Sequence, residues 1–153
     1  MNVALRRMDF DISVKLAIYQ AIADTGKAPT IAQVAAKLDS TTVAIREAFQ
    51  RLSAKRLLVL EPDTFEIRMA PPFSAVPTPF VVAIASKSYF ANCVWDAYGI
   101  AAALHQDVDV SATCGCCGEP MTLAVREGAP VQTPGLAHFA VPAAHWWDDI
   151  VYT

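Results

Sequence analysis

The stretch DVDVSATCGCCGEPMTLAVREG, residues 107–128, predicts a β-hairpin. Its first part, DVDVSATC, alternates apolar and polar residues, which is typical of a strand with one buried face. Gly115 and Gly118 give backbone freedom to the following GCCGEP, so we expect a turn there. MTLAVREG then returns as the paired strand. The hairpin therefore carries three of the chain's four cysteines at one turn: Cys114, Cys116 and Cys117.

The fourth cysteine belongs to the segment that precedes this hairpin. PFVVAIAS, residues 79–86, predicts a short apolar strand, and YFANCVWDAYGIAAAL, residues 89–104, predicts a buried helix. Cys93 and Asp96 are three residues apart and share one face of that helix. Cys93 could be a packing residue, because free cysteine is often buried. A carboxyl group beside it is costly to bury without a purpose.

Composition and charge limit the protein class. The chain has 153 residues, 54% of them hydrophobic and 18% charged, which predicts a folded core. No apolar run is long enough to span a membrane, and the N-terminus does not resemble a secretory signal. We therefore expect a cytoplasmic protein, whose thiols are normally reduced. This favours metal or thiol chemistry for the cysteines over disulfides.

The chain divides at APPFSAVPTPF, residues 70–80, where four prolines fall close together. Residues 1–70 carry ten Lys or Arg and eight Asp or Glu, whereas residues 71–153 carry two and seven. We predict a subdomain over 1–70, a proline-rich linker over 71–80 and a thiol-bearing, catalytic-like domain over 81–153. In the last we also expect a short strand at 136–144, a helical turn at 145–149 and a β-like run at 150–153.

The first subdomain has the element order of a winged helix-turn-helix. Amphipathic or capped helices are expected over 11–26, 30–38 and 41–58, with Thr30 and Gln33 forming a capping box. A hairpin is expected over 57–69. With the strands and helix of the second part, the predicted fold class is α+β, a winged helix followed by a small mixed α/β domain.

The third helix raises the question of DNA binding. Its basic residues could meet phosphates, namely Arg46, Arg51, Lys55 and Arg56. The alternative is a solvated helix surface on a scaffold that reads no nucleic acid, since fold alone does not fix function. The small net charge of residues 1–70 favours this alternative.

The stretch SYFANCVWDAYGIAAALHQDVDVSATCGCCGEPMTLAV resembles the core of the organomercurial (alkylmercury) lyase family. In that family a helix carries a cysteine and, three residues on, an aspartate, as Cys93 and Asp96 are placed here. Another cysteine follows about twenty residues later beside a turn that ends in Gly-x-Pro, as Cys114 and GEP do. The winged-helix part and the proline-rich join are also similar to the family.

The resemblance implies protonolysis of a carbon–mercury bond, which gives a hydrocarbon and Hg(II). Cys93 would bind the mercury of the organomercurial substrate, because a thiolate is a soft donor that suits a soft metal. Asp96 would take a proton from a thiol and give it to the departing carbon as a general acid. Cys114 would be structural, and we expect it to point into the core. The Hg(II) would pass to low-molecular-weight thiols or a mercury reductase, and no resident cofactor is expected.

One departure from the family concerns its second catalytic cysteine, which follows a segment resembling FAVPAAHWWDDIVYT. This sequence has no cysteine after Cys117. We therefore expect either a chain that stops before that residue or a protein that does without it, and in both cases impaired activity. Cys116 and Cys117 are candidate auxiliary thiols that could partly replace it.

Two other interpretations of the thiols stay open. A winged-helix transcriptional regulator could use them to sense a metal or another ligand. A structural zinc held by all four cysteines is less favoured, because the usual pair of C-x-x-C knuckles is missing.

Overall fold

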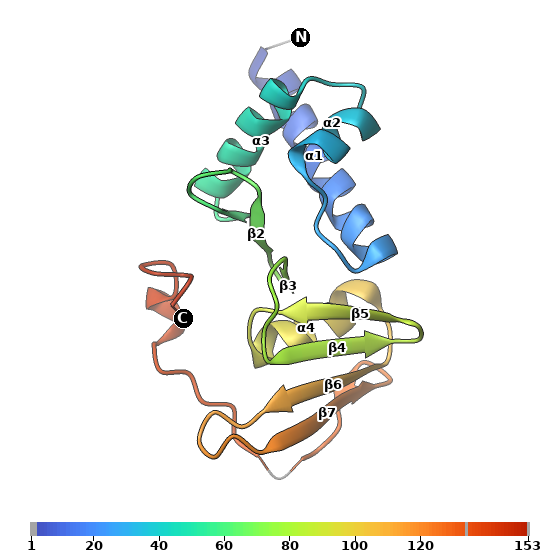
Figure 1. Cartoon of the computed structure of the whole chain (residues 1–153), viewed down its shortest axis with the longest axis vertical. Helices are drawn as coiled ribbons and strands as arrows, with labels where there is room; N and C mark the ends of the chain where they lie inside the picture. Colours follow the sequence, from blue (N-terminus) through green and yellow to red (C-terminus); the bar gives the residue numbers. More distant parts are fainter. Residues whose placement is uncertain (1–2, 134, 153) are drawn as a thin grey trace.

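The computed structural model describes residues 3–133 and 135–152, with side chains from Arg6 onward. The chain begins with three helices, which form one end of the molecule (Figure 1): α1 (Val3–Thr25), α2 (Ile31–Lys37) and α3 (Thr42–Ala54). The predicted capping box of α2 is confirmed, because Thr30 accepts from the Gln33 backbone and the Gln33 side chain accepts in return. The helices enclose an apolar core that includes Ile18, Ile45 and Phe49.

A single antiparallel sheet follows the helices. β1 (Val59–Leu60) pairs with β2 (Ile67–Ala70), which confirms the predicted hairpin. The sheet has eight strands in the spatial order β1-β2-β3-β5-β4-β6-β7-β8. The remaining strands are β3 (Phe73–Ser74), β4 (Phe80–Ile84), β5 (Lys87–Ala91), β6 (Val108–Thr113), β7 (Pro120–Arg126) and β8 (Ala129–Pro130). The predicted α+β class is therefore confirmed as N-terminal helices followed by an antiparallel sheet, and the β6–β7 hairpin forms as expected.

The helix predicted from residue 89 begins later. Residues 87–91 form β5, and α4 covers only Val94–Leu104. The difference arises because Ala85 and Ser86 form a two-residue turn that folds the chain back onto β4, with Ile84 opposite Lys87. Ala85 takes a positive φ of 52°, which is uncommon for alanine and is not expected from the sequence. Tyr89 and Ala91 are then buried on one face at the period of a strand.

The proline-rich segment is part of the sheet. It contains β3, which pairs with both β2 and β5, and a cis peptide bond between Pro71 and Pro72. The C-terminal end of α1 bonds to β5, the strand that pairs with β3. The Tyr89 hydroxyl and the Lys87 ammonium both donate to the Ala23 carbonyl, at 2.9 and 3.0 Å. The helices are thus fixed on the sheet at the end of α1.

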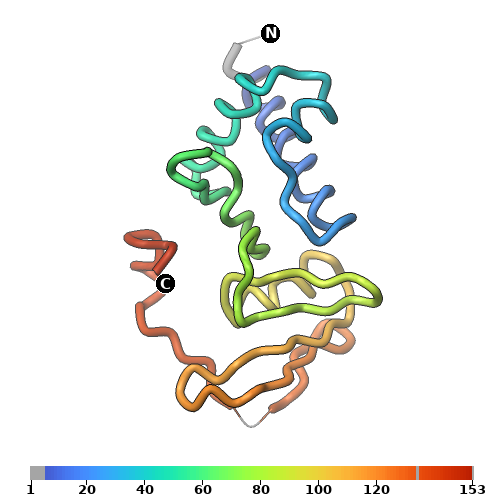
Figure 2. Tube along the Cα trace, viewed as in Figure 1, coloured from blue at the N-terminus to red at the C-terminus, as the bar shows by residue number. Residues whose placement is uncertain are grey.

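The C-terminal segment leaves the sheet and returns toward the helical end (Figure 2). Within the described residues 135–152 it contains one short 3-10 helix, η1 (Ala143–His145), and no strand. The strand expected at 136–144 is therefore wrong, and so is the β-like run as far as residue 152; Thr153 lies outside the described residues. Leu136 is 98% exposed, so the apolar residues of this stretch do not form a buried strand face. Near the end of this segment, the Trp147 ring lies under the guanidinium of Arg56, which follows α3 in the chain.

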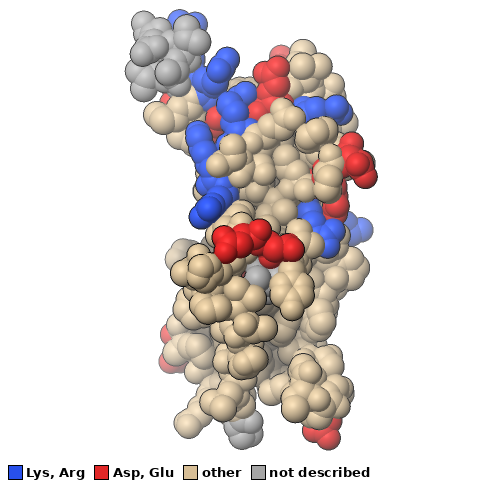
Figure 3. Space-filling model, turned by 90° about the vertical axis from the view of Figure 1, so that its left-hand side faces the viewer, with Lys and Arg blue, Asp and Glu red and all other residues tan. Residues whose placement is uncertain are grey.

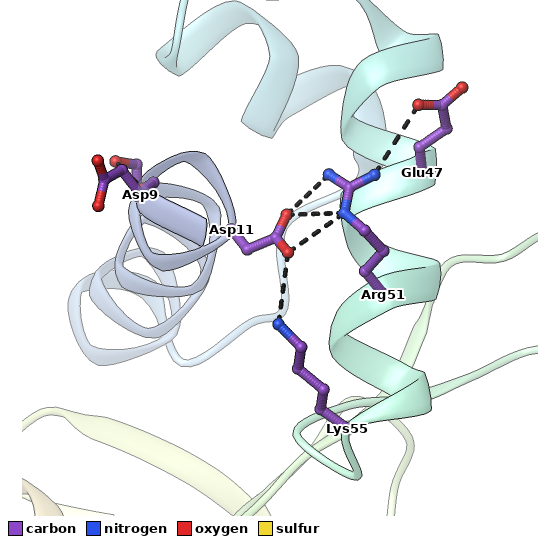
Figure 4. A network of polar contacts seen from close by, with 6 residues as sticks. Asp9, Asp11, Glu47, Arg51 and Lys55 are labelled. Carbon is purple, nitrogen blue, oxygen red and sulfur yellow. Dashed lines mark hydrogen bonds and ion pairs between the residues drawn. The ribbon is translucent and has the colours of Figure 1, made fainter. Parts of the chain in front are cut away.

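The four basic residues considered for DNA contact have partners within the chain. Arg51 binds Asp11 through two guanidinium nitrogens, and Lys55 lies 3.7 Å from the same carboxylate (Figure 4). Arg46 lies over the Phe65 ring, as Arg56 does over Trp147. On the face shown in Figure 3, positive and negative side chains are interspersed over the helical end. None of the described helices has the length and apolar character needed to cross a bilayer.

The Asp11 network predicts a specific stability loss. The Asp11 side chain is 5% exposed and accepts three hydrogen bonds from Arg51, so Asp11→Ala leaves a partly buried guanidinium with only the more distant Glu47 carboxylate as its charged partner. We expect the free energy of unfolding to fall by about 2 kcal/mol, the scale of hydrogen bonds to charged groups. Asp9→Ala is the matched control, because Asp9 lies on the same helix and points away from the network (Figure 4). Urea unfolding measures both, and equal losses would show that the Asp11 pairing is energetically unimportant.

Candidate active site

Cys93 lies at the N-terminus of α4, where the chain leaves β5. It is the N-cap residue of the helix, in an extended conformation with φ −153° and ψ −177°. Its side chain makes no capping hydrogen bond, although it lies near the backbone N–H groups of the first helical turn. The thiol is partly buried and free of any disulfide.

Asp96 lies in the first turn of the same helix, next to Cys93 in space as the spacing predicted. The Asn92 amide donates to one Asp96 carboxylate oxygen at 2.8 Å and reaches the Pro72 carbonyl at 3.4 Å. Burial raises the pKa of Asp96, and the hydrogen bond from Asn92 lowers it by less. The carboxyl group therefore holds a proton more firmly than an exposed aspartate does.

Tyr19 brings α1 into this site. Its hydroxyl donates to the Pro71 carbonyl at 2.8 Å, directly beside the proline that Asn92 contacts. Burial raises the pKa of Tyr19 to about 12, with a further contribution from the negative charge of Asp96. The phenol therefore stays protonated near the carboxyl group and does not compete with it as an acid.

The Cys93 thiol experiences opposing effects. Burial raises its pKa most, and the charge of Asp96 raises it further. The backbone N–H groups of Asp96 and Trp95, at the positive end of the helix, lower it. The pKa remains above the ordinary thiol value, so at neutral pH the thiol is protonated until a metal or a base displaces the proton.

A pocket of about 630 Å³ is lined by the residue that follows Cys93, although Cys93 and Asp96 are not themselves among its lining residues. Val94, the residue after Cys93, forms part of its wall, together with apolar side chains of β4, α4, β6 and β7. At its other boundary lie the hairpin turn and residues 135–138 of the C-terminal segment. The apolar part of the wall includes Phe80, Val94, Tyr98, Met121 and Leu123.

Cys114, at the hairpin turn, does not lie where the sequence predicted. That residue is partly exposed and lines the pocket with Cys116, so the expectation that it points into the core is wrong. β6 ends at Thr113, one residue earlier, and the inward-facing positions of this strand are taken by Val110 and Ala112. Cys116 and Cys117 are exposed.

In the structure Cys93 lies near Asp96, and the three cysteines of the β6–β7 turn lie near one another. Across residues 3–133 and 135–152, no three His, Cys, Asp or Glu side chains form a group that could hold a metal ion. All four cysteines are within these ranges, so they do not form the zinc site considered as an alternative. The replacement of the family's second cysteine by Cys116 or Cys117 stays a prediction.

Two residues of this site were missed by the sequence reasoning. Asn92 precedes the N-cap Cys93 and donates to Asp96 from outside the helix, so the helical spacing rule gave no signal for this pair. Tyr19 gave no signal either, because only the fold brings α1 against the Pro71–Pro72 segment.

The candidate site thus combines a partly buried thiol at a helix N-terminus with a partly buried carboxyl group in the first turn of the same helix, and Val94, the first residue of that helix, lines an apolar pocket. The model of the family Alkylmercury lyase matches residues 73–153, which is more than half of the chain. The chain therefore belongs to the alkylmercury lyase family. A solved structure described as the mercury-bound form of MerB2 is similar, with a TM-score of 0.65 and 26% identity over 81% of this chain. This chain spans 59% of that one. No curated protein matches.

The two thiol environments predict different reactivity with pH. Because the Cys93 pKa is raised and the Cys114 pKa is lowered, alkylation by iodoacetamide should reach half its maximal rate at a lower pH for Cys114. The raised pKa means that Cys93 becomes a thiolate only at a pH above the ordinary value of about 8.5. Mass spectrometry of peptides after timed labelling measures both rates. Equal profiles would contradict the assigned environments.

Burial of Asp96 predicts a stability effect that depends on pH. The folded protein holds the proton more tightly than the unfolded chain, so this group's contribution to stability is present at low pH and is lost as pH rises through the folded-state pKa. Asp96→Asn keeps the acceptor for Asn92 without the charge. It should raise the urea midpoint at neutral pH and leave it nearly unchanged at pH about 3, below the usual aspartate pKa. The exposed Asp63→Asn control should shift neither, and a lower midpoint at neutral pH would refute the reasoning.

Proposed function

We propose that this protein cleaves carbon–mercury bonds, with Cys93 as the mercury ligand and Asp96 as the proton donor. The observation that supports this most is the placement of a partly buried carboxyl group of raised pKa in the first helical turn after a thiol that is in no disulfide. A general acid must hold its proton until the bond breaks, and a raised pKa meets that need. Family membership supports the same chemistry.

The reaction can be written with atoms and charge balanced. The Cys93 thiol gives its proton to the Asp96 carboxylate, and its sulfur displaces the ligand X⁻ from R–Hg–X. Asp96 then protonates the carbon, the electron pair of the carbon–mercury bond moves to carbon, and R–H leaves. Hg(II) remains on Cys93. Asn92 holds the carboxyl group by its amide and is a positioning residue in this scheme.

We place the organic group R in the pocket to which Val94, the residue after Cys93, contributes. Its walls include Phe80, Val94 and Leu123, which are apolar and suit a hydrocarbon. Once the Cys93 sulfur has displaced X⁻, the carbon of R lies opposite that sulfur on the mercury, so R extends away from Cys93.

A second sulfur ligand on the mercury would increase its electron density and weaken its bond to carbon. We infer that a low-molecular-weight thiol supplies this ligand and carries Hg(II) away. Turnover should then depend on the external thiol concentration. Cys116 or Cys117 is the alternative source.

The N-terminal helices and the β1–β2 hairpin follow the order of a winged helix, and we infer that they serve as a scaffold. Tyr19 of α1 contacts the segment that Asn92 links to Asp96, which supports this role. A DNA-binding sensor is not proposed, because the four basic side chains named above, in α3 and directly after it, contact groups of their own chain.

The test is hydrocarbon release. The purified protein, incubated with phenylmercuric acetate and excess 2-mercaptoethanol, should release benzene, measured by gas chromatography. Cys93→Ser should abolish release. Asp96→Ala should still bind mercury but release benzene roughly 10²-fold more slowly, the scale of general acid catalysis. Asp148→Ala, at an exposed aspartate of the C-terminal segment, should behave as the parent. No benzene from the parent protein would refute the proposed function.

A further inference from the structure

The β6–β7 turn brings two particular thiols together. The Gly118 N–H donates to the Cys114 carbonyl at 2.9 Å, which closes one helix-like turn over residues 114–118. Residues three apart in such a turn lie on the same side, at about 5–6 Å between Cβ atoms. Cys114 and Cys117 have this spacing, and the Cys117 thiol lies close enough to lower the pKa of Cys114. Gly118 has a φ of 74°, which lets the chain turn back into β7 at once.

The same turn directs backbone donors at one sulfur. The N–H groups of Cys117 and Cys116 act on the Cys114 sulfur and, with the Cys117 thiol, lower its pKa. Burial and the charge of Glu119 raise it by less. The Cys114 N–H is bonded to the Glu119 carbonyl at 2.9 Å, so the hairpin holds the arrangement in place without help from the side chains.

The geometry points to Cys114 and Cys117 as a two-thiolate binding site for Hg(II), separate from Cys93. Neither residue is in a disulfide, and Cys117 is exposed while Cys114 lines the pocket that begins at Val94. One site therefore opens both to solvent and to the pocket next to the proposed catalytic cysteine.

A mercuric ion fits this pair better than zinc does. Structural zinc takes four ligands, and the described residues offer no group of even three around the turn. Hg(II) is a soft ion that is satisfied by two thiolates, and two sulfur atoms already close together require little rearrangement to hold it. Two linked thiols also hold the metal against free monothiols, because the second sulfur binds at a high effective concentration.

Binding is a ligand exchange in which no electrons are transferred. The two thiols lose their protons to solvent, and their sulfur atoms displace two ligands from Hg(II). At this position the pair would accept the Hg(II) that leaves Cys93, and this role, though not the binding itself, rests on the proposed function. An exposed thiol pair would then pass the ion to a thiol-bearing acceptor.

The experiment uses mercuric chloride and a Cys93→Ser background, so that bond cleavage plays no part. Protein loaded with one equivalent of Hg(II) is passed through a desalting column in excess 2-mercaptoethanol, and bound mercury is measured by elemental analysis. Cys93→Ser should keep close to its full load. Adding Cys114→Ser or Cys117→Ser should lower retention by about tenfold or more, as expected when the second linked thiol is lost.

Cys116→Ser in the same background is the matched control, because it changes a thiol of the same turn outside the proposed pair, and it should retain mercury. Circular dichroism of each variant shows whether the hairpin is preserved. Retention that is unaffected by Cys114→Ser and Cys117→Ser, or lost equally with Cys116→Ser, would overturn the inference. Benzene release by the parent protein is scored separately, so failure of the lyase proposal and failure of this site are distinguishable.

Discussion

The contact between α1 and the Pro71–Pro72 segment determines the environment of the site. Tyr19 donates to the Pro71 carbonyl, and Asn92 reaches the carbonyl of the next proline while it holds Asp96. At the same place α4 approaches closely, since a Cβ on Gly99 would lie 3.2 Å from the Pro72 side chain. Helices, sheet and site therefore meet at two consecutive residues. Through Asn92 this segment is linked to Asp96, whose burial is the main cause of the upward shift in its pKa.

The molecule contains two thiol environments that suit different tasks. At Cys93, burial outweighs the helix N-terminus, so the thiol keeps its proton and can deliver it to a neighbouring carboxylate when a metal binds. At Cys114, backbone donors act on a sulfur beside solvent, and the thiolate is favoured. The first environment suits a step that needs a proton, and the second suits holding a metal ion. A pocket connects the regions of the two, although the cysteines belong to different elements.

Sequence reasoning succeeded where the pattern was local. The capping box of α2, the β1–β2 and β6–β7 hairpins and the proximity of Cys93 to Asp96 all depend on residues a few positions apart. It failed at residues 87–91, because the turn that reverses the chain uses Ala85 at positive φ where glycine or asparagine is usual. It also failed at Cys114, where the end of the strand decides whether the next side chain points inward. Tyr19 was beyond its reach, since the partner of its hydroxyl is 52 residues away.

The contacts that stabilise this fold and its reactive groups lie in different parts of the chain. The Arg51–Asp11 pair and the buried faces of α1 and α3 stabilise the helical end at a distance along the chain from any cysteine. The reactive groups lie at ends of elements instead: Cys93 where α4 begins, and Cys114 where β6 stops. Backbone N–H groups are unpaired at such ends and are available to a sulfur atom. Placing each thiol there lets the backbone tune its acidity, while regular packing elsewhere keeps the two positions fixed.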